Sequence, residues 1–353
     1  MRRRSRTAIQ IALICGIVLL VGTATLLAWL TFPGTPAAAR SLRFEGFVSL
    51  PAGTHSKTLN ILDYLTVNGT RLFVTNVSSG DVYKIDLHDD LLPRATDIAV
   101  FASEPGAHGV AIDPASHLAF VTRSGANTVD VFDPGDMKLI NRIAVADDPD
   151  GIFYDSINRT VYVVSGDAGM ATLIDPAKKS VTATIPLGGK PEFAVFDPRS
   201  NLLYQNLKDT NSLVALNIAN RLIVGRWLLH QCEAPTGIAI DAVHHRLFIA
   251  CGRTSTLAVF DIGKHQIVAS LPIGRGPDSV AFDPALKRIY STGLTGDLTV
   301  IQQDSSDVYH VIDTIHLHFG AHTLAIDLMT HRVFVGYASL FLRPRVAVFG
   351  AIQ

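Results

Sequence analysis

Seven positions of the chain could bind a metal ion or a charged ligand, and they recur at intervals of 42 to 45 residues. Four of them are carboxylates and two are imidazoles, a composition that apolar packing would not select. In chain order they are Asp63, His108, Asp150, Glu192, Thr236, Asp278 and His322. Carboxylate oxygen and imidazole nitrogen together bind Zn²⁺, Cu²⁺ or a similar divalent ion. A ligand site therefore follows if the fold brings these positions together.

Each position opens the same short motif. The polar residue follows Pro or Ala in six copies and precedes an apolar run that ends in Asp, as in residues 277–283, while residues 63–68 form a degenerate first copy. Each unit contains four short runs of alternating, β-branched or aromatic residues bounded by Gly, Pro, Asp and Asn, which predicts four antiparallel strands. Seven such units predict an all-β fold, a seven-bladed β-propeller of four-stranded blades over residues 41–353.

The second run of each unit carries a resemblance to a known family. Three of these runs are Leu72-Phe-Val-Thr-Asn76, Ala119-Phe-Val-Thr-Arg123 and Val161-Tyr-Val-Val-Ser165. In these runs and their in-phase repetition, the sequence resembles the YVTN-repeat (YncE-like) β-propeller family over nearly all of residues 41–353. The resemblance implies a seven-bladed propeller and leaves the ligand open.

The two ends of the repeat array predict how the ring closes. The seventh unit stops at Gln353 without a fourth strand, whereas residues 43–50 resemble the fourth strands of the other units. We therefore predict that residues 43–50 form the outer strand of the seventh blade and leave no open edge between the first and last blades.

The first strand of each propeller blade lines the central channel, so the seven polar positions are predicted to form a ring at one channel mouth. In one interpretation these side chains only solvate the channel and cap strand ends. In the other they bind a small polar ligand, a metal ion or a segment of a protein partner.

Four of these positions come from consecutive blades, because the seventh blade adjoins the first. They are His322, Asp63, His108 and Asp150, and we predict that they could hold one divalent metal ion with mixed nitrogen and oxygen ligation. An alternative function follows: a metal-dependent hydrolase or lyase in which the ion activates water, with Asp278 or Glu192 as general base.

The pair Cys232 and Cys251 is expected at one face of the fifth blade, in the entering loop and at the end of the second strand. In an oxidising compartment a disulfide between them is the prediction, and two buried thiols are the alternative.

The N-terminal 40 residues differ from the rest of the chain. After Arg2, Arg3, Arg4 and Arg6 comes an apolar stretch, residues 8–32, long enough to cross a bilayer as one helix. We predict a single-pass membrane anchor with the basic flank in the cytoplasm and the propeller outside it, in the periplasm or extracellular space. The small residues 37–39 leave open a second outcome, secretion after cleavage near Ala39.

The charge balance argues against nucleic acid as a partner. The chain has 30 basic and 31 acidic residues, and without the four N-terminal arginines 26 basic residues remain, five fewer than the acidic ones. Nucleic-acid binding depends on neutralisation of phosphates by Lys and Arg, which such a balance does not favour. The predicted function is therefore an extracytoplasmic module that binds a small polar ligand or an exported protein partner through its channel mouth.

Overall fold

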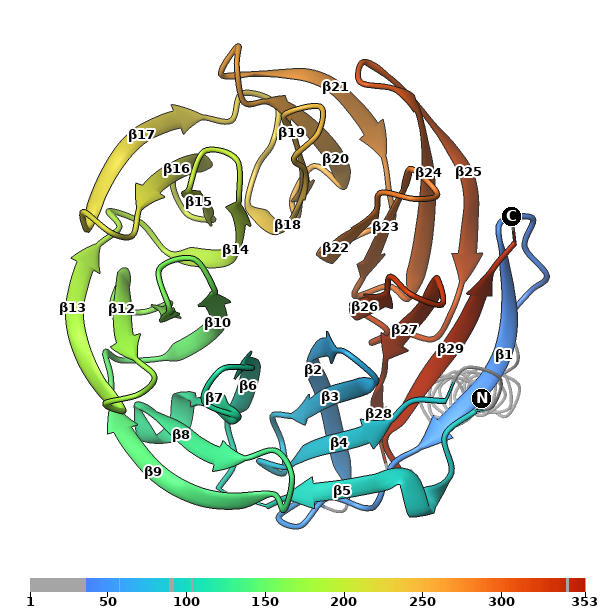
Figure 1. The fold of residues 1–353 in the computed structure, drawn as a ribbon. Coiled ribbons are helices and arrows are strands. Elements are labelled where there is room, and N and C mark those ends of the chain that lie inside the picture. The colour runs from blue at the N-terminus through green and yellow to red at the C-terminus, as the bar shows by residue number, and fades with distance from the viewer. Residues whose placement is uncertain (1–35, 57, 89–91, 103, 341–342, 353) are drawn as a thin grey trace, which may run out of the picture.

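The computed structural model describes residues 36–352, except residues 57, 89–91, 103 and 341–342. Seven antiparallel sheets stand around a central axis, and neighbouring blades follow one another in chain order (Figure 1). The all-β, seven-bladed propeller is therefore confirmed. Outside the strands, the described residues contain two short 3₁₀ turns, η1 (Ala95–Asp97) and η2 (Ser124–Ala126).

Each blade runs from an inner strand at the axis to an outer strand at the rim. Blade 1 contains β2 (Leu59–Asn68), β3 (Arg71–Asn76), β4 (Val82–Asp86) and β5 (Ile98–Phe101). Blade 2 contains β6 (Ala107–Asp113), β7 (Leu118–Arg123), β8 (Thr128–Asp133) and β9 (Lys138–Ala144). Blade 3 contains β10 (Pro149–Asp155), β11 (Thr160–Ser165), β12 (Met170–Asp175) and β13 (Ser180–Pro186).

The second half of the ring repeats the pattern. Blade 4 contains β14 (Pro191–Asp197), β15 (Leu202–Leu207), β16 (Ser212–Asn217) and β17 (Leu222–Leu228). Blade 5 contains β18 (Pro235–Asp241), β19 (Arg246–Cys251), β20 (Thr256–Asp261) and β21 (Gln266–Pro272). Blade 6 contains β22 (Pro277–Asp283), β23 (Arg288–Gly293), β24 (Asp297–Ser305) and β25 (Val308–His316).

Blade 7 is assembled from both ends of the chain. It contains β26 (Thr323–Asp327), β27 (Arg332–Gly336), β29 (Arg345–Ala351) and β1 (Leu42–Ser49). β1 pairs antiparallel with β29 from Leu42 opposite Ala351 to Ser49 opposite Arg345, and the two strands lie side by side at the rim (Figure 1). The predicted closure by the N-terminal strand is confirmed, with a shift of one residue in its bounds.

The sequence did not predict one further strand. β28 (Ala338–Leu340) leaves blade 7 and pairs with the start of β2, at Leu59 to Ile61, so the sheet of blade 1 has five strands.

The core lies between neighbouring blades, because the middle strands of each sheet are buried on both faces. Between blades 2 and 3, Phe120 and Val131 pack in one cluster with Val161 and Ile174. The outer strands alternate instead between partly buried and exposed positions, as in β17. Apolar packing in seven such layers holds each inner strand at a fixed place on the axis.

The Asp that ends the repeated motif has a structural role. The Asp155 carboxylate accepts a hydrogen bond from the backbone N–H of Ile157 at 2.9 Å, and Asp283 accepts one from Ala285 at 3.0 Å. Such side chain to backbone bonds stabilise the tight turn into the second strand. These turns lie at the end of each blade opposite the predicted site residues.

The predicted membrane-spanning segment, residues 8–32, lies outside the described residues. Within the ranges that the structure does describe, neither 3₁₀ turn nor any other helical segment has the length and apolar character that a bilayer span requires.

The position of β1 in blade 7 leads to a prediction about stability. Leu42 is 2% exposed and packs in one cluster with Phe349, between blades 6 and 7. We expect Leu42→Ala to lower the free energy of unfolding by about 2–4 kcal/mol, as for other buried large-to-small changes. The measurement is urea unfolding of the purified variant. Arg43→Ala is the matched control, because the adjacent Arg43 side chain is 76% exposed. Equal stability of the two variants would contradict a closing role for β1.

Candidate functional site at the channel mouth

Most of the predicted site residues lie at an irregularity in the pairing of their inner strand. In β6, Ala107 pairs with Arg123 and the next regular pair is Val110 with Val121, so His108 falls between them. The same kind of shift spans the predicted positions of five other inner strands, namely Asp63, Asp150, Glu192, Thr236 and Asp278. A β-bulge changes the direction in which a side chain points, so it can turn these residues toward the axis.

The glycines after two of these residues allow the blades to approach each other. A Cβ added at Gly109 would come within 2.7 Å of the Ile152 side chain in the next blade, and one at Gly237 within 2.6 Å of the Asp278 carbonyl oxygen. Only glycine leaves room for this approach. The inner strands therefore crowd one another at the level of the predicted ring.

His108 lies between two carboxylates. Its Nδ1 is 2.6 Å from Asp63 Oδ2 and 3.4 Å from Asp150 Oδ1, while its Nε2 is 2.9 Å from the Ser124 hydroxyl. Burial lowers the pKa of His108, but the hydrogen bond to Asp63 and the negative charges of Asp63 and Asp150 outweigh burial and raise it to about 8. The imidazole is therefore cationic at neutral pH in the absence of a ligand.

Asp63 also belongs to a second group, with Asp278 and His322. Donor atoms of these three residues lie within 4.8 Å of one another, as do those of Asp63, His108 and Asp150. His322 donates a hydrogen bond from Nδ1 to the Gly320 carbonyl oxygen at 2.8 Å. The set predicted to hold one metal ion is thus divided: His322 meets Asp63 together with Asp278, and His108 meets Asp63 together with Asp150.

The two remaining predicted residues are arranged differently. Glu192 forms an ion pair with Lys208 at 2.8 Å. Thr236 is buried, and its hydroxyl donates to the Pro277 carbonyl oxygen at 2.8 Å, so it joins blade 5 to blade 6. Glu192 therefore lacks the free carboxylate that a general base needs, and the Thr236 hydroxyl is already used within the protein.

Two carboxylates of the ring have raised pKa values. Burial, followed by the charge of Asp63, raises the pKa of Asp150 to about 7 against the opposing effect of His108. Burial raises the pKa of Asp278 to about 6, where His322 lowers it and Asp63 and Glu192 raise it. Negative charges at close range make it unfavourable for all carboxylates of a site to be ionised together. The ring therefore holds more carboxylates than its own positive charges can balance.

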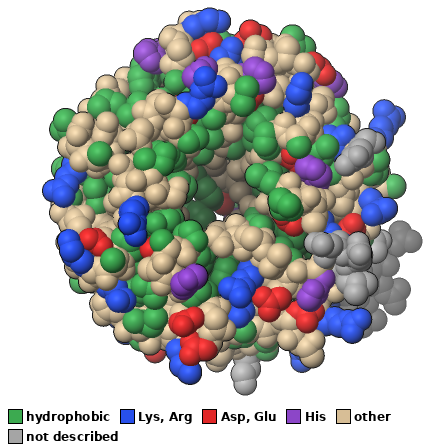
Figure 2. All heavy atoms as spheres, viewed as in Figure 1, with side chains coloured by type: hydrophobic (Ala, Val, Ile, Leu, Met, Phe, Trp, Pro, Cys, Tyr) green, Lys and Arg blue, Asp and Glu red, His purple; other side chains and the backbone are tan. Residues whose placement is uncertain are grey.

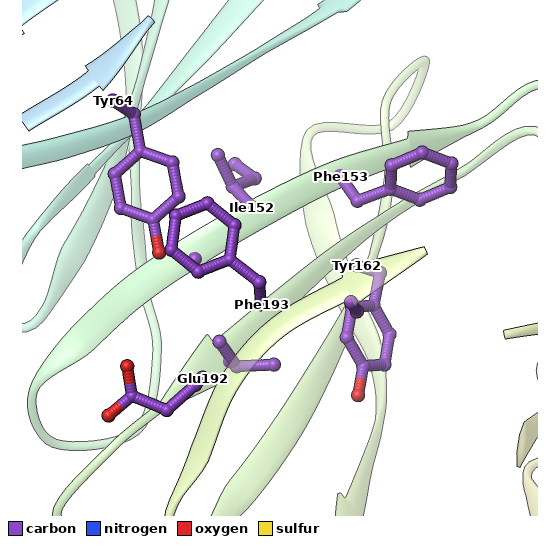
Figure 3. Close-up of a pocket in the computed structure, with 9 residues that line it drawn as sticks. Tyr64, Ile152, Phe153, Tyr162, Glu192 and Phe193 are labelled. Atoms are coloured by element: carbon purple, nitrogen blue, oxygen red, sulfur yellow. The ribbon is translucent and has the colours of Figure 1, made fainter. Parts of the chain in front are cut away.

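Two aromatic rings stack next to the polar ring. Tyr64 and Phe193 follow Asp63 and Glu192 directly in the sequence, and their rings stack at 4.6 Å between centroids although they belong to blades 1 and 4 (Figure 3). A small pocket of about 100 Å³ lies beside them, lined by Ile152, Phe153 and Tyr162. The Tyr64–Phe193 pair therefore forms a floor beneath the polar ring. We refer to the ring above this floor as the cup. Sequence reasoning did not identify the floor.

The cup continues outward between blades 5 and 6. A pocket of about 500 Å³ is lined there by Asp278 and His322 on one side and by Lys208 and Arg253 on another. The space-filling view shows that the molecule is hollowed at its centre (Figure 2). Acidic groups at the axis and basic groups at the rim therefore line one continuous space.

The structure contains a disulfide between Cys232 and Cys251, with the Cα atoms 5.0 Å apart. It joins the loop before β18 to the end of β19, and both sulfur atoms are buried between blades 4 and 5. The bond stiffens the loop that enters blade 5 on the cup side.

Comparison with known proteins shows the fold. No protein-family model matches the sequence, and no curated protein sequence matches it. Among solved structures, a chain of a mitotic checkpoint complex is 14% identical, with 91% of this chain and 96% of that chain covered and a TM-score of 0.72. The WD40 repeats of RRP9 are 11% identical, with 91% and 100% covered and a TM-score of 0.71. A chain of hydrazine synthase from Kuenenia stuttgartiensis is 18% identical, with 72% and 99% covered and a TM-score of 0.53.

At these identities the likeness is one of fold, so the chain is similar to WD40-type propellers in architecture. The resemblance to the YVTN-repeat family stays a prediction.

The crowded ring predicts how stability depends on pH. Between its unfolded pKa near 4 and its folded pKa of about 7, Asp150 binds more protons in the folded state, so stability falls as pH rises through this window. His108 acts in the same direction between about 6.5 and about 8. We expect the free energy of unfolding without ligand to fall by on the order of 1–2 kcal/mol from pH 5 to pH 8, discounted because Asp150 is 32% exposed.

The measurement is urea unfolding at each pH. Asp150→Asn should be more stable than the wild type at pH 8 and should lose most of this advantage at pH 5. A wild type that becomes more stable as pH rises from 5 to 8 would contradict the predicted crowding.

Proposed function

We propose that this protein is a membrane-anchored, extracytoplasmic β-propeller that binds a small, positively charged ligand in its cup. The observation that carries the proposal is the convergence of Asp63, Asp150 and Asp278 above one floor, with no Lys or Arg ion pair to any of the three among the described residues. Among the Lys, Arg and His ion pairs of these residues, the three carboxylates share a single imidazole, His108, so part of their negative charge has no close counter-ion, which is unfavourable in a partly buried site. A bound cation would supply the missing positive charge.

The surroundings of the cup favour a ligand that also carries a negative or polar end. Lys208 lies 2.8 Å from Glu192 at the edge of the acidic ring, and Arg253, whose side chain is 74% exposed, lines the same 500 Å³ pocket. A small molecule with its cationic group near Asp278 could place an anionic group beside these two residues. This arrangement suits a compact polar molecule better than a polyanion.

The position of the N-terminal strand supports the proposed orientation at a membrane. Leu42 lies at the end of β1 that pairs with Ala351, and Arg288 donates to the carbonyl oxygens of Ser41 and Ile352 at 3.2 and 2.8 Å. This end of the blades is opposite the cup. If residues 8–32 span the bilayer as proposed, the chain reaches the propeller from behind and the cup opens away from the membrane.

Binding of a protein partner is compatible with this proposal, because the propeller fold is typical of protein-interaction modules. One structurally similar propeller is a chain of a mitotic checkpoint complex. An exported segment with a Lys or Arg side chain would present the same positive charge to the cup.

A metal-dependent hydrolase or lyase is the second candidate. The two groups of His and Asp donors favour it, since an ion bound by three protein ligands keeps a position open for water. The ion pair of Glu192 with Lys208 counts against it, because one of the two expected general bases is engaged. Its test is hydrolysis of p-nitrophenyl acetate and p-nitrophenyl phosphate by the Zn²⁺-loaded protein, with loss of turnover in His108→Ala.

The binding proposal predicts which probes stabilise the protein. We expect putrescine and arginine to raise the melting temperature of the full-length protein in detergent in a saturable way, because a ligand that binds the folded state stabilises it. Succinate, an anion of similar size, should have no such effect. Asp278→Asn should weaken binding of both cationic probes at least tenfold.

Asp167→Asn is the control for that change, because Asp167 is 63% exposed at the rim and pairs with Lys190 rather than with the cup. Its affinity for the probes should equal that of the wild type. Stabilisation by succinate alone, or unchanged putrescine and arginine binding by Asp278→Asn, would overturn the proposal.

A further inference from the structure

The donor atoms of the cup form two groups that share one carboxylate. One group is Asp63, His108 and Asp150, and the other is Asp63, Asp278 and His322. Each contains one imidazole and one carboxylate of its own, and among the described residues no such group contains both imidazoles. The geometry therefore offers two centres on either side of Asp63.

Both imidazoles are held by partners outside these groups. The His322 Nδ1–H donates to the Gly320 carbonyl oxygen, which leaves Nε2 as the nitrogen with a lone pair in the neutral ring. The His108 Nε2 is bonded to the Ser124 hydroxyl, so its Nδ1 faces Asp63 and Asp150. Histidines that bind metal ions characteristically use their second nitrogen in this way, because the bond fixes the ring and its tautomer.

In the group of Asp63, His108 and Asp150, the distances between donor atoms suit a metal ion in place of the hydrogen that His108 and Asp63 share. His108 Nδ1 and Asp150 Oδ1 are 3.4 Å apart, close to the roughly 3.3–3.4 Å between two ligands of a tetrahedral ion with bonds of about 2.0–2.1 Å. Asp150 Oδ1 is buried and has no hydrogen-bond partner in the described part of the chain. His108 and Asp63, at 2.6 Å, share a hydrogen that metal binding would release.

We propose that the cup binds two divalent transition-metal ions, one at Asp63, His108 and Asp150 and the other at Asp63, Asp278 and His322, with the Asp63 carboxylate bridging them. This inference rests on the proposed function, because it specifies the positive charge that the cup binds. One imidazole and two carboxylates per ion suit Zn²⁺, Co²⁺ or Mn²⁺. Paired ions in proteins lie about 3.5–4 Å apart, a spacing that a single bridging carboxylate can span.

Two ions also use all the donor groups of the site. Three aspartates converge on the two centres, and Glu192 already has Lys208 as its counter-ion. A single ion would leave the aspartate and the imidazole of the other group without a bound ion. The second ion therefore occupies donor atoms that a single ion would leave unused.

The experiment is metal stoichiometry on the full-length protein in detergent. The protein is stripped with EDTA, loaded with ZnCl₂ or CoCl₂, dialysed and analysed for metal. We expect two ions per chain for the wild type, one for Asp150→Asn and one for Asp278→Asn. Asp63→Asn should lower the affinity for both ions at least tenfold, because it changes the shared ligand.

Asp167→Asn is the matched control, since it removes an exposed carboxylate that pairs with Lys190 and lies outside both groups, and it should still bind two ions. A measurement on the wild type alone guards against variants that misfold. Electron paramagnetic resonance of the Mn²⁺-loaded protein should show two exchange-coupled ions, as a bridging carboxylate requires.

A stoichiometry of one ion, or complete loss of metal in both Asp150→Asn and Asp278→Asn, would overturn the two-ion inference. So would two uncoupled Mn²⁺ ions. If no metal binds but putrescine or arginine does, the inference fails while the proposed function stands. If neither a metal nor an organic cation binds, both fail.

Discussion

Antiparallel pairing of β1 with β29 is the constraint on which the rest of the molecule depends, because it joins the last blade to the first. In a closed ring every blade packs against two neighbours, and no blade can move outward without opening two apolar layers. The inner strands therefore have fixed places around the axis. As a result, carboxylate oxygens of Asp63 and Asp278 lie within 4.8 Å of each other although the two residues are far apart in the sequence.

Closure alone would leave polar side chains spread around a channel, and two local features turn this channel into a cup. Irregular pairing at the start of the inner strands directs consecutive residues toward the axis. Asp63 and Glu192 can therefore contribute carboxylates while the next residues, Tyr64 and Phe193, stack across the channel. The stacked rings give the carboxylates an apolar neighbour, and repulsion among carboxylates grows in a less polar setting. The proposed affinity for positive charge follows from that geometry.

The sequence was sufficient to predict the propeller, the number of blades and the origin of the closing strand, because all three depend on a repeated pattern of strands. It also identified seven positions on or beside the inner strands, and five of these bring their donor atoms together. It could not predict how their side chains pair, since the Thr236 hydroxyl turns to Pro277 in the next blade and Glu192 turns to Lys208. Nor could it assign His108 and His322 to different groups, because that depends on bulge geometry to within a few ångströms. The floor was missed for a simple reason: strict alternation predicts that Tyr64 points away from the channel when Asp63 points into it.

The first and last strands of the propeller end next to each other, which bears on the order of the blades along the chain. The backbone N–H of Ile352 donates to the Ser41 carbonyl oxygen at 2.8 Å, so in the propeller alone a short peptide link could join these two residues without disturbing β1 or β29. New ends could then be opened at any of the Asp-capped turns, which lie on the same side and away from the cup. The four strands of blade 7 would then belong to one continuous stretch of chain, and the propeller would be circularly permuted with the residues of the cup in place.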